Sequence, residues 1–60
     1  MSTRTELSSV ATGLDELAER VSSIAEGLLG EEREVVAPQL FEIERALRRA
    51  QRGLRQILDR

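Results

Sequence analysis

Apolar residues recur along the first half of the chain in steps that alternate between three and four residues. This spacing keeps them on one stripe of an α-helix and is typical of the seam along which helices pack in coiled coils and bundles. The pattern predicts a first helix over about residues 4–28. Its seam comprises Leu7, Val10, Leu14, Leu17, Val21, Ile24 and Leu28.

The second half repeats this spacing and predicts a second helix over about residues 32–58. Pro38 falls inside it, and a proline removes a backbone hydrogen bond and crowds the preceding turn. Either the helix kinks near Pro38, or residues 31–36 form a looser turn and the regular helix begins at Ala37. A seam residue ahead of the proline favours the kinked helix. The second seam comprises Val36, Leu40, Ile43, Leu47, Ala50, Leu54 and Ile57.

Local signals at the helix ends predict an antiparallel hairpin. Thr3 and Glu6 have the spacing of a capping box, which marks the start of the first helix. Gly30 suits a left-handed C-terminal cap and predicts a turn over about residues 29–31. So short a connection joins antiparallel neighbours. The acids Glu31, Glu32 and Glu34 suit the positive N-terminus of the following helix.

Three alanines flank the first seam at seven-residue spacing, namely Ala11, Ala18 and Ala25. Small residues beside a seam let another helix approach closely. A single hairpin has one helix–helix interface and would leave this flank exposed to water. We therefore expect an all-α protein, with a single domain over residues 1–60, in which the hairpin dimerises into a four-helix bundle. A tetramer is the larger alternative.

Charge is distributed unevenly along the chain, although the net charge is only −2. Residues 1–30 carry a net charge of −3 and residues 31–44 a net charge of −4, whereas residues 45–60 carry +5. A dimer with its two loops at opposite ends would place each acidic tip beside the basic end of its partner. We expect that arrangement over one with both loops together.

The composition excludes most catalytic chemistry. A chain of 60 residues is short for a stable independent core, and it has no Cys for a disulfide. It also lacks His, Lys and Tyr, so we expect no enzyme, no catalytic residue, no metal site and no cofactor. No apolar run approaches the roughly 20 residues of a membrane span. Because no signal-peptide pattern is evident either, we expect a cytoplasmic protein.

One face of the second helix carries a second candidate feature, a stripe of guanidinium groups headed by the only aromatic residue. Its members are Phe41, Arg45, Arg48, Arg49, Arg52 and Arg55. Such a face could contact phosphate or an acidic protein surface, but it also fits a solvated outer face near the glutamates of a neighbouring helix. The acidity of the remaining chain makes nucleic acid the less favoured partner. Phe41 either anchors a partner protein or turns inward as core.

The expected architecture resembles that of the small Rop-type RNA-binding proteins, which are helical hairpins that dimerise. The resemblance lies in layout and length, and no functional residue is carried over. The sequence therefore predicts a homo-oligomeric interaction or regulatory module, whose partner is a second copy or another protein. A Rop-like nucleic-acid or nucleotide-binding regulator is the alternative.

Overall fold

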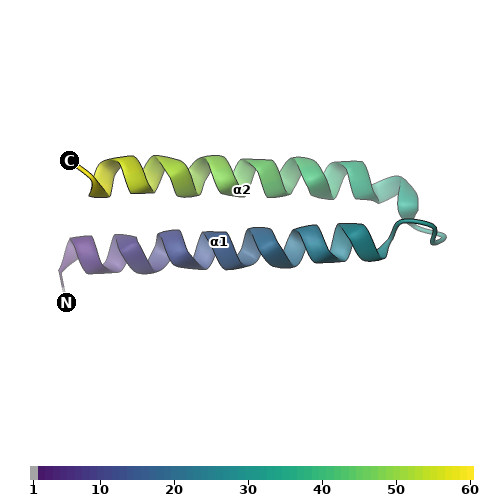
Figure 1. Ribbon diagram of the computed structural model, residues 1–60, viewed down its shortest axis with the longest axis horizontal. Helices are drawn as coiled ribbons and strands as arrows, with labels where there is room; N and C mark the ends of the chain where they lie inside the picture. The colour runs from purple at the N-terminus through teal and green to yellow at the C-terminus, as the bar shows by residue number, and fades with distance from the viewer. Residues whose placement is uncertain (1) are drawn as a thin grey trace.

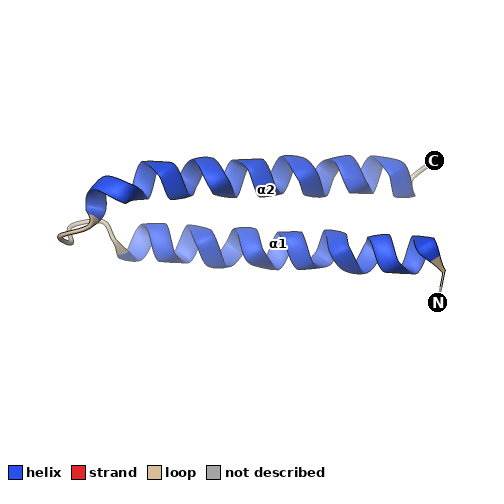
Figure 2. Ribbon diagram, turned by 180° about the vertical axis from the view of Figure 1, so that it is seen from behind, coloured by secondary structure: helices blue, strands red, loops and turns tan. Residues whose placement is uncertain are grey.

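The computed structural model describes residues 2–60, which form two antiparallel helices lying side by side (Figure 1). Helix α1 spans Thr3–Gly27 and helix α2 spans Ala37–Leu58, with a short 3-10 helix, η1, at Glu34–Val36. Residues 2–60 contain no strand (Figure 2). The prediction of an all-α fold with two packed helices is confirmed. The start of α1 and the end of α2 lie at one end of a layer measuring 46 × 17 × 10 Å, and the connection lies at the other.

Helix α1 begins at Thr3, one residue earlier than a capping box at Thr3 implies, because the N-cap is Ser2. Ser2 is the N-cap, and its hydroxyl accepts a hydrogen bond of 3.1 Å from the backbone N–H of Thr5. Glu6 lies in the first turn, where its negative charge suits the positive end of the helix. Gly13 does not interrupt α1, so the seam runs along one continuous helix.

The connection between the helices is longer than the predicted turn over residues 29–31, because it extends from Leu28 to Val36. Gly30 has a φ of +82°, which confirms the predicted left-handed conformation. Its N–H donates to the carboxylate of Glu34, and the N–H of Glu31 donates to the carbonyl of Leu28 at 3.0 Å. These two bonds hold the reversal at the tip of the hairpin.

The prediction of a second helix that kinks at Pro38 is wrong. The alternative, a looser turn over residues 31–36 followed by a regular helix from Ala37, is observed. Helix α2 begins at Ala37, so Pro38 lies in its first turn. A proline there loses nothing, because its missing N–H would have no partner within the helix. The predicted start near residue 32 is replaced by turns and η1. The acids Glu31, Glu32 and Glu34 consequently lie in the connection, not in the first turn of α2.

We expect Gly30→Ala to destabilise the fold by about 1 kcal/mol, because a Cβ disfavours the left-handed conformation. No atom lies within 4 Å of the site where that Cβ would be, so the cost comes from the backbone and not from a clash. Gly30→Asn should cost less, since asparagine tolerates this conformation better. Urea unfolding of both variants checks the order, and equal losses would contradict it.

The contact between the two helices is centred on the alanine row of α1. Ala11, Ala18 and Ala25 have no exposed surface. The expectation that these residues form an exposed flank for a second hairpin is therefore wrong. Because alanine ends at Cβ, the row lets the backbone of α2 lie close to that of α1, and the two helices of one chain enclose it.

Helix α2 meets this row with a seven-residue repeat of its own. Ala37 and Leu58 are buried at its ends, and Glu44 and Gln51 are half-buried between them. Residues 2–60 contain no large side chain that is fully buried, and their core consists of four alanines and one leucine. So small a core is weak support for a domain of this length.

Candidate functional site

The two apolar seams do not face each other within the hairpin. On α1, every second seam residue comes directly before a buried alanine, and its side chain therefore points about 100° away from the direction of α2. We call these the outer seam residues. On the second helix, each outer seam residue likewise comes directly before a residue of the row that contacts α1. That contact row is Ala37, Glu44, Gln51 and Leu58. The outer seam residues are Val10, Leu17, Ile24, Val36, Ile43, Ala50 and Ile57.

An ion pair between the helices shows that the two outer rows lie on the same face. Arg48 of α2 reaches Asp15 of α1, at 3.2 Å between the guanidinium Nη1 and the carboxylate Oδ1. Asp15 follows Ala11 by four positions and Arg48 follows Glu44 by four, so both lie on the same side of the contact row. The residues that precede the contact rows must share the opposite side. We call that side the open face and the side of Arg48 the polar face.

The open face is broad, apolar and exposed. Leu17 keeps 46% of its surface exposed and Ile24 57%, while Ile43 and Ile57 of α2 keep 48% and 52%. Between these outer rows lie half-buried residues of the same seams, which line the groove where α1 meets α2. They are Leu7, Leu14, Val21, Leu28, Leu40, Leu47 and Leu54. All the seam residues expected from the sequence therefore border one continuous surface.

The polar face is organised by Arg48, whose side chain is 34% exposed. Its Nε donates a 2.8 Å hydrogen bond to Glu44, and its guanidinium also lies 3.7 Å from Glu19. The hydrogen bond to Glu44 raises the pKa of Arg48, and the negative charges of Glu44, Asp15 and Glu19 add to the effect. The guanidinium thus stays charged while it bridges the two helices.

We expect Arg48→Gln to lower the thermal midpoint, because the three carboxylates around Arg48 would then repel one another. Arg49→Gln is the matched control, since Arg49 is the exposed neighbour on α2. The difference between the two variants should shrink in high salt, which screens surface charges. Thermal unfolding followed by circular dichroism measures both. Equal midpoints at low salt would remove the bridging role of Arg48.

The rest of the arginine stripe divides between ion-paired and exposed residues. Arg45 pairs with Glu42 one turn earlier on α2. Arg49, Arg52 and Arg55 are exposed. The predicted stripe therefore contains two arginines held in ion pairs, Arg45 and Arg48, and three exposed ones. Glutamates of a neighbouring helix were one of the surroundings expected for this stripe, and Glu19 of α1 lies near Arg48. The sequence did not identify Asp15 and Glu19 as the partners, because a spacing pattern on one helix carries no information about its register against the other.

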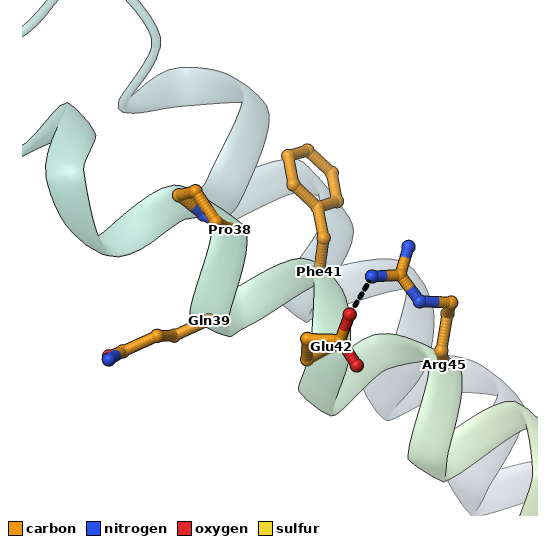
Figure 3. A pocket seen from close by; sticks show the side chains of 5 residues that line it. All are labelled: Pro38, Gln39, Phe41, Glu42 and Arg45. Atoms are coloured by element: carbon orange, nitrogen blue, oxygen red, sulfur yellow. Dashed lines mark hydrogen bonds and ion pairs between the residues drawn. The ribbon is translucent and has the colours of Figure 1, made fainter.

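Phe41 lies near the tip of the hairpin on the polar side. Its ring stands between Pro38 and Arg45 above a shallow hollow of about 420 Å³, and Gln39 points away (Figure 3). On its other side it borders a second hollow of about 290 Å³ with Val35. Phe41 is half-buried, so its ring is neither enclosed in the core nor fully exposed for a partner protein.

Neither a metal-binding cluster nor a membrane-spanning helix is present in the part of the chain that the structure describes. Residues 2–60 contain no cluster of three or more acidic, histidine or cysteine side chains placed to hold a metal ion. Within the same residues, neither helix combines the length and apolarity needed to cross a membrane. The open face is the largest feature that remains.

Comparison with protein-family models, curated proteins and solved structures found no significant match. The function of this chain is therefore inferred from its own geometry. The open face is the best candidate for a binding surface, because it gathers most of the exposed large apolar side chains on one side of the molecule.

Proposed function

We propose that the protein is a non-enzymatic helical module whose open face binds a second copy, giving a homodimeric four-helix bundle. One observation carries this proposal: both seams border the same face, while the hairpin itself buries only alanines and Leu58. Hydrophobic burial is the main driving force of folding, and in a single hairpin outer seam residues such as Leu17, Ile24 and Ile57 keep about half of their surface exposed. A partner that covers the open face supplies it.

The shape of the open face suits a second copy of itself. A layer of 46 × 17 Å presents roughly 800 Å², which is about what each partner contributes to a stable interface. A two-fold dimer uses the same patch on both copies, so one pattern of apolar rows serves both sides. Two stacked two-helix layers form a four-helix bundle with interhelical angles of about 20°.

The glycines of the helices support the same partner surface. Gly13 and Gly53 lie at the outer borders of the open face, one position beyond the outer seam rows on the helical wheel. A glycine inside a helix costs about 1 kcal/mol relative to alanine. No atom of the hairpin lies within 4 Å of a Cβ built at either position, so packing within the chain does not require them. Small residues at these borders leave room for the side chains of a docked copy.

As a self-assembling module, the protein acts through protein–protein contact, in an interaction or regulatory role. The chain has few side chains suited to catalysis, since the sequence contains no His, Cys, Lys or Tyr. In the bundle, the polar face of each copy would remain on the outside. That face, with Arg48 and the Phe41 hollow, would then be available to a further protein.

Light scattering across a dilution series tests the proposal. We expect a mass of about 13 kDa, twice the 6.7 kDa of one chain, and a loss of helix signal as the dimer dissociates. A larger multiple of the chain mass would indicate a tetramer built on the same face. A helical, cooperatively folding monomer at micromolar concentration would contradict self-assembly. A monomer that folds only with a different protein would assign the open face to a hetero-complex.

Nucleic-acid binding is the second candidate, and the exposure of Arg49, Arg52 and Arg55 favours it. Contacts with phosphate release counterions, so binding to a short RNA or DNA duplex would fall steeply with salt. Replacing these three arginines by glutamine should then abolish binding, whereas Arg20→Gln on α1 should not. If the parent protein produces no shift of either nucleic acid at low salt, this candidate fails.

A further inference from the structure

The two ends of the hairpin carry opposite charge. Arg48 pairs with Asp15 near the middle of the molecule, which divides it into a loop half and a terminal half. Residues 16–47, the loop half, hold eight acidic and three basic side chains, a net charge of −5. Residues 1–15 and 48–60 hold three acidic and six basic side chains, a net charge of +3. Figure 1 shows these halves at opposite ends of the long axis.

Little of this charge is neutralised within one chain. The ion pairs seen among residues 2–60 all belong to Arg45 or Arg48. The glutamates at the tip and the exposed arginines near the C-terminus lie at opposite ends of a 46 Å molecule. That separation is several times the Debye length of about 10 Å at 0.1 M salt, so the two groups cannot compensate each other within the hairpin.

We propose that the second copy docks with its loop at the opposite end, so that each acidic tip lies beside the arginine-rich end of its partner. This inference rests on the bundle proposed above and concerns only its orientation. A two-fold axis along the hairpin would place both loops together, and one across it would place them apart. Either arrangement covers the open face, so burial of apolar surface does not choose between them.

Electrostatics makes the choice. With the loops together, two loop halves of −5 meet at one end and two terminal halves of +3 meet at the other. With the loops apart, each −5 half lies over a +3 half. Arg52 and Arg55 follow Arg48 by four and seven positions and share its polar face, so the attraction acts through the thickness of the bundle and is strongest at low salt. Like-charge juxtaposition is a common way in which interfaces reject a wrong orientation. The charge asymmetry of the chain is therefore an orientation signal for its own assembly.

Pairs of spin labels measure the orientation directly. The chain has no native Cys, so one introduced thiol gives a single labelling site. Arg33→Cys places a label in the connection without removing an acid, and Gln56→Cys places one near the C-terminus; both positions are exposed. Dipolar electron resonance on the Arg33→Cys dimer should give a separation close to the 46 Å length of the hairpin. The Gln56→Cys dimer should give one about 12 Å shorter, because Gln56 lies four residues before the C-terminus of each copy at about 1.5 Å per residue. A mixture of the two labelled chains should add a short distance, within about 20 Å or two helix spacings.

The outcomes separate the orientation from the bundle itself. A short distance for Arg33→Cys alone, together with a long one in the mixture, would overturn the proposed orientation and leave the bundle intact. The absence of any dipolar signal, with a monomeric mass for the same samples, would overturn the bundle and the orientation with it. Circular dichroism of each labelled chain confirms that the label has not unfolded the helices.

Discussion

Replacing Leu17 by lysine is expected to dissociate the dimer and unfold most of the helix. In the proposed bundle, Leu17 lies in the core between two hairpins, where an unpaired charge costs on the order of 3 kcal/mol or more. The two-fold axis doubles this cost, because both copies carry the substitution. A small domain has little stability to lose, so we expect the mass to fall to that of one chain and the helix signal to collapse.

The same substitution would have little effect on a hairpin that works alone. Leu17 already exposes 46% of its surface there, and lysine is a good helix former. Ser23→Lys is the matched control, since it adds the same charge at an exposed position of α1 that lies away from the open face. Light scattering and circular dichroism at one concentration compare the two variants. Similar behaviour of Leu17→Lys and Ser23→Lys would mean that nothing covers the open face.

Replacing Ala18 by leucine is expected to destabilise the hairpin by about 1–3 kcal/mol. Ala18 has no exposed surface, and the row to which it belongs sets how closely α1 and α2 lie. A larger side chain has no space there unless the helices separate, and such overpacking has a cost of this size. The loss should appear as a lower midpoint in urea.

Thr12→Leu is the control for this prediction. Thr12 is an exposed residue of α1, away from both the alanine row and the open face. A leucine there should change the free energy of unfolding by less than about 0.5 kcal/mol. If Ala18→Leu behaved like Thr12→Leu, the alanine row would not be the contact between the helices.

The apolar spacing predicted two helices correctly but not which row of residues joins them. Large seam residues and small flanking alanines are adjacent on the surface of α1, and either row could face α2. Burial resolves the choice: Ala18 is enclosed within the hairpin, whereas Leu17 is half-exposed. The alanine row allows close approach within a chain and leaves the larger residues on the open face. The spacing of apolar residues cannot show which of the two rows faces α2, because both rows have the same seven-residue repeat.

The connection shows a similar limit. A seam residue before Pro38 suggested a helix that continues through the proline, and the acidic residues from Glu31 onward suggested its first turn. The structure instead begins α2 at Ala37, which gives Pro38 a position that needs no N–H. Competing local signals of this kind differ by about 1 kcal/mol, so sequence inspection could state both solutions but could not rank them reliably.

The candidate site was predictable in its members but not in its arrangement. The seam residues of both helices were identified from spacing alone, yet their convergence on one face follows from the register that Arg48 and Asp15 reveal. The arginine stripe was also visible in the sequence. Its division into ion-paired and exposed members depends on Glu42, Glu44 and the carboxylates of α1, which come together only in the folded hairpin.

The most direct test of the central claim is an isotope-filtered nuclear magnetic resonance experiment on an equimolar mixture of labelled and unlabelled chains. Contacts are recorded only between methyl groups of one chain and protons of the other. We predict intermolecular cross peaks from Leu17, Ile24 and Ile43, and none from Ala18, which its own hairpin encloses. Folded protein in which the methyl groups of the open face show no intermolecular contact would contradict the account.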